Sequence, residues 1–178
     1  MMVRTDPRRA GAVRRYHTWP TIQTQTVAEA SWNVARILVM IWPEAPAPAI
    51  THALLNDCGE IRCGDLPFPI KRDNPVLKAE IVRLEQDSLR EQGILGLAEH
   101  GTMHNEHGLW IKRAKICDML EMWEFGLDEI ALGNRYAQPI VEGTIDDVWN
   151  LAEVYDLGVD DSRAISEYVK WRMTKTPA

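Results

Sequence analysis

The stretch that decides the fold is Thr26-Val-Ala-Glu-Ala-Ser-Trp-Asn-Val-Ala-Arg-Ile-Leu-Val-Met-Ile-Trp42. Thr26 can cap a helix that starts here, and Glu29 three residues later completes a capping box. The prolines of residues 43–48 end the helix, because proline cannot continue the hydrogen-bond ladder. Apolar residues recur in this stretch at three- and four-residue spacing, which is typical of one face of an amphipathic helix: Val27, Ala30, Val34, Ile37, Leu38 and Ile41.

The same periodicity predicts more helices on the carboxyl-terminal side of this stretch. We expect them at about 49–58, 75–92, 109–126, 144–157 and 160–173, with Thr144 as the cap of the fourth. The glycines and prolines of residues 59–69 predict a rigid non-helical turn, and residues 93–108 are expected to form a loop. No stretch alternates with a period of two for long enough to predict a strand.

The sequence therefore predicts an all-α fold, a single compact helical bundle over residues 1–178. Within it we expect residues 1–13 to form a flexible arm. The motif-bearing core is expected at 14–124, and closing helices at 144–173.

Length and charge restrict the class of protein. A chain of 178 residues suits one domain with a sizeable core. Its net charge of -6 argues against bulk binding to nucleic acid or to a membrane surface, but not against a small anionic ligand. The longest apolar run, 34–42, is too short to span a bilayer. Three cysteines, no CxxC motif and no visible leader favour a reduced, cytoplasmic protein.

One carboxylate stands on an otherwise apolar helix face. Asp118 shares this face with Ile111, Ala114, Met122 and Phe125. A carboxylate in such a place costs on the order of several kcal/mol unless it is paired or bound to a metal ion. Taken alone, Asp118 is more often a hydrogen-bonded buried acid than a metal ligand.

A second acidic cluster follows the helix expected at 49–58. Asn56, Asp57 and Glu60 place three oxygen-bearing side chains near its end, and Asp65 follows in the turn. Taken alone, each of these residues is explained by an ordinary polar helix end or turn, without a role in function. Together with Asp118 they indicate an acidic pocket.

Five motifs follow one another along the chain: Arg15-Tyr16, Val27-Ala-Glu-Ala30, Asn56-Asp-Cys-Gly-Glu60, Gly64-Asp-Leu-Pro-Phe-Pro-Ile-Lys71 and Lys115-Ile-Cys-Asp118. In order and spacing they resemble the HD-domain 5'-deoxynucleotidases and the phage relatives that remove triphosphate from dATP. The resemblance covers about two-thirds of the chain, and Gly-Asp-Leu-Pro-x-Pro-x-Lys is its most specific part. It implies an HD-domain fold and a metal-dependent phosphohydrolase that acts on deoxynucleotides, either as a dNTP triphosphohydrolase or as a 5'-deoxynucleotidase.

The resemblance also implies a metal site. One divalent ion (Mn, Co, Mg or Zn) is held in the family at four positions, which fall here on Ala30, Asn56, Asp57 and Asp118. The first two are histidines in the family, so only the two aspartates match. Alanine offers no donor atom and asparagine only a neutral oxygen, so affinity for Zn²⁺ or Co²⁺ should fall by orders of magnitude. Two aspartates and an amide suit Mg²⁺ or Mn²⁺ loosely.

The resemblance assigns further roles to two acids. Glu60 falls where the family has the carboxylate that serves the attacking water, and Asp65 where an acid helps to place water and sugar.

The remaining positions concern the nucleotide itself. Phosphate contacts fall on Arg15, Lys71 and Lys115, while Tyr16 and Thr18 fall near the sugar and the base. A deoxynucleotide is the implied ligand, and a homo-oligomer, dimer or larger, is the implied assembly.

Three explanations fit the missing histidines. Inactivating substitutions could have been introduced to trap a substrate, the chain could be a natural relative that kept nucleotide binding and lost catalysis, or another histidine, His52 foremost, could complete the site. We therefore expect a phosphohydrolase impaired at its metal site, and as the alternative a non-catalytic nucleotide-binding protein. A purely structural protein is disfavoured because so many of the motif residues remain.

Overall fold

The computed structural model describes residues 6–94 and 106–175. Within these ranges the sole β pairing is a single bridge between Arg14 and Thr26, so the prediction of an all-α fold is confirmed. The helical elements are α1 (Pro7–Ala10), α2 (Val27–Ile41), α3 (Ala47–Leu55), the 3₁₀ helix η1 (Asn56–Ile61), α4 (Phe68–Asp73), α5 (Pro75–Glu91), α7 (Glu106–Ala131), the 3₁₀ helix η2 (Arg135–Ala137), α8 (Gln138–Val154) and α9 (Val159–Met173). None of the described helices is both long and apolar enough to cross a bilayer.

Helix α2 begins where its sequence predicts. The Thr26 hydroxyl accepts a hydrogen bond from the Glu29 amide, and the Glu29 carboxylate accepts one from the Thr26 amide, which completes the capping box. Ile37 and Leu38 on its apolar face are fully buried. Burying one such side chain stabilises the fold by roughly 1.5–3 kcal/mol, so this face determines which side of α2 turns inward.

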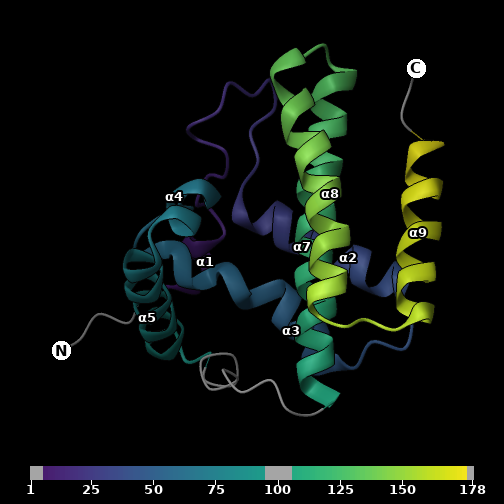
Figure 1. Ribbon diagram of the computed structural model, residues 1–178. Helices are drawn as coiled ribbons and strands as arrows, with labels where there is room; N and C mark the ends of the chain where they lie inside the picture. Colours follow the sequence, from purple (N-terminus) through teal and green to yellow (C-terminus); the bar gives the residue numbers. More distant parts are fainter. Residues whose placement is uncertain (1–5, 95–105, 176–178) are drawn as a thin grey trace.

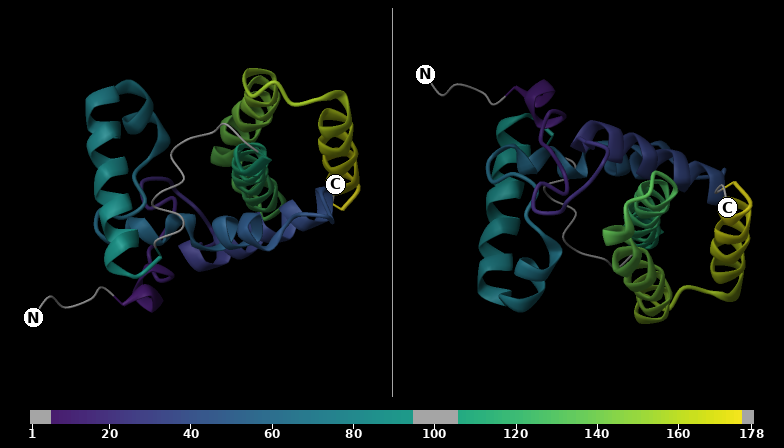
Figure 2. Two further views of the ribbon diagram at one scale, coloured as in Figure 1. Left: turned by 90° about the horizontal axis from the view of Figure 1, so that it is seen from below. Right: turned by 90° about the horizontal axis from the view of Figure 1, so that it is seen from above.

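Helices α7 and α8 run side by side through the middle of the molecule, and α2 packs across α7 (Figure 1). Figures 1 and 2 show α9 at one end and the pair α4 and α5 at the other. One core cluster joins side chains from five helices, α2, α3, α7, α8 and α9, including Leu38, Ala53, Leu120, Val148 and Ile165. The closing helices therefore share their core with the motif-bearing helices.

Two boundary predictions are wrong. Helix α8 begins at Gln138 rather than at Thr144, because Pro139 sits in its first turn, where proline is well tolerated. Thr144 is buried in the middle of that helix and caps nothing. The turn expected over 59–69 ends earlier than predicted, since Pro69 lies in the first turn of α4 instead of breaking the helix.

Residues 6–13 of the predicted arm contain a short helix that packs against the rest of the molecule. Asp6 caps the short helix α1, and Ala10 is fully buried. The carbonyl of Val13 accepts a hydrogen bond of 2.9 Å from the amide of Val27, which ties this segment to the start of α2. Residues 1–5 lie outside the described part of the chain. The expected loop at 93–108 is also too long, because α7 begins at Glu106, and residues 95–105 are not described.

Candidate functional site

A cavity of about 440 Å³ lies between the segment 15–19, η1, α7 and the start of α8. This volume is within the range of small-molecule sites in proteins. Ala30 is the single predicted site residue that is absent from its wall, since it is fully buried in α2. The other predicted site residues all line the cavity: Arg15, Tyr16, Thr18, Asn56, Asp57, Glu60, Asp65, Lys71, Lys115 and Asp118.

The acidic cluster stands on a 3₁₀ helix and not on the end of an α-helix as predicted. Helix α3 ends at Leu55, and η1 carries the next residues. Side chains three residues apart eclipse one another in a 3₁₀ helix, so Asp57 and Glu60 stand on one side. Between them, Gly59 approaches α5 so closely that a Cβ added there would lie 2.8 Å from the Cβ of Glu85.

We expect Gly59→Ala to destabilise the protein by about 1–3 kcal/mol, because η1 and α5 must separate to admit the methyl group. A Cβ at Gly143, in the interior of α8, would meet nothing within 4 Å. Gly143→Ala is the matched control and should be neutral or stabilise by up to about 1 kcal/mol. Urea unfolding of both variants measures the change in the free energy of unfolding. A Gly59→Ala variant as stable as the parent would show that the close contact with α5 does not exist.

Two carboxylates with opposite pKa shifts face each other across the cavity. Burial, and after it the negative charge of Asp118, raises the pKa of Asp57. Burial acts in the same direction on Asp118, but Lys115 and Arg15 outweigh it and hold the pKa of Asp118 below its ordinary value. Lys115 makes a hydrogen-bonded ion pair with Asp118 one turn along α7, and Arg15 Nη2 lies 3.7 Å from Asp118 Oδ1. The cavity therefore holds one firmly ionised acid and one whose ionisation is opposed.

Lys71 supplies the positive charge on the α5 side of the cavity. Its Nζ lies 3.9 Å from Glu60 Oε1 and 3.6 Å from Glu85 Oε1. Burial, and after it the charge of Asp57, raises the pKa of Glu60 to about 9, although Lys71 opposes the shift. Ionisation of Glu60 is therefore opposed, and its buried Oε2 has no hydrogen-bond partner among the described residues.

The segment that carries Arg15 and Tyr16 is held by α7. Arg15 Nη1 donates to Glu121 Oε2 at 3.2 Å, and Gln25 Nε2 donates to the other oxygen of the same carboxylate at 2.6 Å. The Tyr16 ring stacks on Phe125, with centroids 4.6 Å apart and an interplanar angle of 11°. Tyr16 has a φ of 54°, which a residue other than glycine rarely adopts, so its position is maintained by these contacts.

Several residues of the site were not predicted as such. Glu121 stands three residues after Asp118 on the same helix face, and this spacing was a usable signal. Thr144 and Asp147 reach the cavity from α8, which lies outside the motifs. Glu85 on α5 contacts Lys71 at the edge of the cavity.

The donor atoms present do not fit Zn²⁺ or Co²⁺. The buried side chain at position 30 is a methyl group, and the exposed Asn56 amide donates to Asp57 Oδ1 at 2.9 Å. Within residues 6–94 and 106–175, no group of three or more His, Cys, Asp and Glu side chains is arranged to hold a metal ion. Two aspartates and one amide provide no nitrogen or sulfur ligand, which Zn²⁺ and Co²⁺ prefer.

The two histidines whose side chains the structure describes, His17 and His52, do not change this result. His52 lies on α3 and is not among the residues that line the cavity, so the proposal that it completes the site has no support in the geometry. His17 lines the cavity from the segment after Tyr16. His100, His104 and the side chain of His107 lie outside the described part.

Comparisons with known proteins identify the family and the fold. A family model described as 5'-deoxynucleotidase YfbR-like matches residues 8–135. Among solved structures the chain is similar to the HD phosphohydrolase DatZ of cyanophage S-2L, bound to dA and one catalytic Zn²⁺ ion. The two share 21% sequence identity over 96% of this chain and 95% of that chain, with a TM-score of 0.74, so they share a fold. No curated protein matches the chain.

Proposed function

The chain belongs to the YfbR-like 5'-deoxynucleotidase family, and we propose that it binds a deoxynucleotide in the cavity beside α7 while hydrolysis is impaired at the metal site. The observation that carries this proposal is the convergence of Arg15, Lys71 and Lys115, from three separate parts of the chain, on one cavity. Three cations around one cavity match the charge of a phosphate group.

A bound phosphate would replace the carboxylates that pair with these three cations. Arg15, Lys71 and Lys115 each lie within 4.0 Å of an acid in the absence of ligand. Such pairs place the cations in advance, which lowers the entropy cost of binding. Tyr16 and Thr18 line the same cavity and would contact the sugar and the base.

The acidic residues of the cavity would act in the hydrolysis step and not in nucleotide binding. A divalent ion, when bound, would activate water and polarise a phosphoryl oxygen. Asp57 and Asp118 would be its remaining ligands, with Glu60 and Asp65 beside the attacking water, but the donor set does not fit a tightly held ion. The second candidate function, a nucleotide-binding protein without turnover, is favoured by the same observation: Ala30 and Asn56 remove ligands while the phosphate cations remain.

We expect Lys71→Ala and Lys115→Ala each to weaken the binding of dAMP and dATP by about 1–3 kcal/mol, because each removes one charge-assisted hydrogen bond. Lys78→Ala, on the exposed face of α5, is the matched control and should bind as the parent does. Titration calorimetry with dAMP and with dATP measures the loss of affinity. Comparing the two affinities of the parent shows whether the site prefers a monophosphate or a triphosphate. Unchanged affinity in both cavity variants would refute the assignment.

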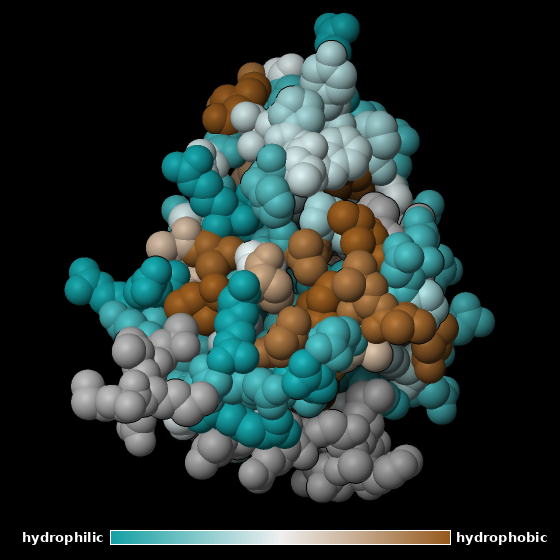
Figure 3. Space-filling view, turned by 90° about the vertical axis from the view of Figure 1, so that its left-hand side faces the viewer, coloured by the Kyte–Doolittle hydropathy of each residue, from teal (hydrophilic) through white to brown (hydrophobic). Residues whose placement is uncertain are grey.

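We also expect a homo-oligomer, dimer or larger, in the cytoplasm. The face formed by α4 and α5 bears a band of apolar side chains (Figure 3), including the exposed Ile70, Val76, Leu77 and Val82. Exposed apolar surface of this kind is typical of association sites. Light scattering after size exclusion should give at least twice the 20.3 kDa of one chain. A strictly monomeric protein at all concentrations would contradict it.

A further inference from the structure

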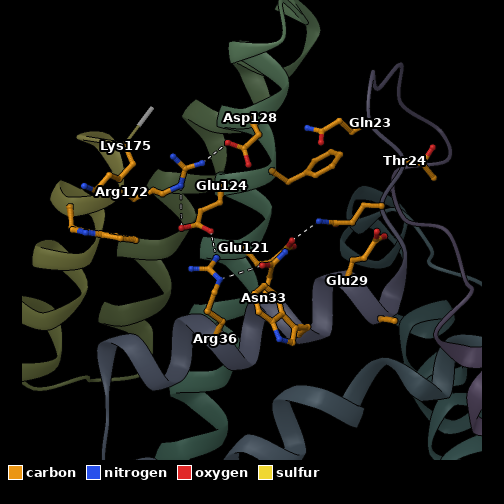
Figure 4. Close-up of a pocket in the computed structure, with 15 residues that line it drawn as sticks. Gln23, Thr24, Glu29, Asn33, Arg36, Glu121, Glu124, Asp128, Arg172 and Lys175 are labelled. Atoms are coloured by element: carbon orange, nitrogen blue, oxygen red, sulfur yellow. Dashed lines mark hydrogen bonds and ion pairs between the residues drawn. The ribbon is translucent and has the colours of Figure 1, made fainter. Parts of the chain in front are cut away.

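A second cavity, of about 700 Å³, lies between α2, α7 and α9 (Figure 4). The indole rings of Trp32 on α2 and Trp171 on α9 are 61% and 41% exposed at its rim. Gln25 and Glu121 form part of its buried floor. The Arg36 guanidinium lies 6.0 Å from the centre of the Trp32 ring, and the Tyr168 ring is tilted against Trp171 with 5.6 Å between centroids. The exposed parts of both indoles remain open to a further stacking partner.

Acidic side chains outnumber basic ones in this cavity, as they do in the first. Arg36 and Arg172 both pair with Glu124, and Arg172 pairs with Asp128 as well (Figure 4). The lining carries three basic side chains against four acidic ones: Arg36, Arg172 and Lys175 against Glu29, Glu121, Glu124 and Asp128. Its arginines are therefore already paired, and the lining has no surplus of positive charge that would require a phosphate group on the ligand.

The polar groups of the cavity suit a heterocycle. Gln25 is 7% exposed, and its Nε2 donates to Glu121 while its buried Oε1 has no hydrogen-bond partner among the described residues. A buried acceptor without a hydrogen-bond partner destabilises the protein by about 1–3 kcal/mol. A ligand that donates a hydrogen bond to it would remove this loss. The side-chain amides of Gln23 and Asn33 lie in the same wall. Amides pair with the adjacent donor and acceptor atoms of nucleobases, and indoles stack on their faces.

We propose that this cavity is a second binding site, and that its ligand is a nucleoside. The stacking face would be Trp32, and the base edge would meet Gln25 and its neighbouring amides.

Two contacts connect this site to the first cavity. Glu121 and Phe125, one turn apart on α7, line the second cavity and touch Arg15 and Tyr16 of the first. A nucleoside that fixes Gln25 and Glu121 would therefore fix Arg15, which strengthens nucleotide binding. This coupling rests on the proposed function, whereas the nucleoside site itself does not.

The test is titration calorimetry of the full chain with adenosine. We expect Trp32→Ala to weaken adenosine binding about tenfold or more, the scale of one lost base stack. Trp149→Ala removes a 37% exposed indole of α8 that lines neither cavity, and it should bind adenosine as the parent does. Trp171→Ala is a second cavity variant, and thermal unfolding checks that each variant is folded.

A second titration separates the two cavities. With dAMP at saturation, adenosine should still bind, and dAMP itself should bind more tightly when adenosine is present. Adenosine binding that survives Trp32→Ala and Trp171→Ala unchanged, or that dAMP displaces, would overturn the proposal, as would an absence of adenosine binding to the parent. If dAMP does not bind at all but adenosine binding still requires Trp32, the proposed function fails and the nucleoside site stands.

Discussion

Ala30→His combined with Asn56→His is expected to give a protein that binds Zn²⁺ or Co²⁺ tightly and hydrolyses deoxynucleotides. The parent, by contrast, should hold little of either metal after purification and should show weak or no hydrolysis. The two imidazoles would join Asp57 and Asp118, whose charges already act on each other across the cavity. Two nitrogens and two carboxylate oxygens form an ordinary zinc ligand set, so affinity should rise by orders of magnitude.

The two substitutions differ in their expected effect on the stability of the metal-free protein. Asn56 is exposed, so histidine fits there freely. Ala30 is fully buried in α2, so histidine there overpacks the helix and should destabilise the metal-free protein by about 1–3 kcal/mol. The sequence alone predicted no such cost. Added Zn²⁺ should reverse the loss, because a ligand that binds only the folded state stabilises it.

Metal content per chain and phosphate release measure the outcome. Adding Asp118→Asn to the double variant should remove the metal, and adding Glu60→Ala should remove turnover while the metal stays. A parent that already holds one Co²⁺ per chain would show that another residue completes the site. A double variant that binds no metal would show that Asp57 and Asp118 do not converge on one ion.

Local patterns in the sequence predicted the helices well, but their exact limits less well. The capping box of Thr26 and Glu29 placed the start of α2 correctly, because both partners lie within four residues. Thr144 has the same capping chemistry, yet it is buried in the middle of α8. There Pro139 starts the helix earlier, and packing against α7 favours the longer helix.

The motifs predicted which residues gather at the cavity, but not how they are held. Arg15 and Glu121 are 106 residues apart in the chain, and no periodicity connects them. The role of the buried carboxylate of Glu129 was likewise not predicted, since two of its partners are backbone amides of the distant loop, which any sequence would supply. Such contacts depend on the packing of whole elements and are not encoded in local spacing.

Glu129 at the end of α7 holds the loop that follows Tyr16. Its carboxylate is 1% exposed and accepts hydrogen bonds of 2.7 Å from the amides of both Ile22 and Gln23. Asn134 Nδ2 donates to the same carboxylate at 2.6 Å and to the carbonyl of Pro20 at 2.8 Å. The loop that brings Tyr16 and its neighbours to the first cavity is therefore fixed at its far side by one buried anion.

Glu129→Gln should destabilise the protein by about 1.5–3 kcal/mol at neutral pH, the range for hydrogen bonds to a charged group. It should also weaken dAMP binding, because the loop that carries Tyr16 loses its anchor. Glu142→Gln, an exposed residue of α8 that accepts a hydrogen bond from Gln138, is the control and should change neither quantity.

The loss of stability in Glu129→Gln should depend on pH in one direction. Burial raises the pKa of Glu129, but the hydrogen bonds from Asn134, Ile22 and Gln23 outweigh burial and hold the pKa below the ordinary value of 4.5. A group whose pKa is lower in the folded state stabilises the protein fully above its unfolded pKa, and loses that effect as the pH falls through the folded one. Urea unfolding should therefore separate parent and Glu129→Gln at pH 7 and bring them closer at about pH 3. A gap of equal size at both pH values would mean that the amides of the loop do not bind an ionised carboxylate, and that the loop is held by packing alone.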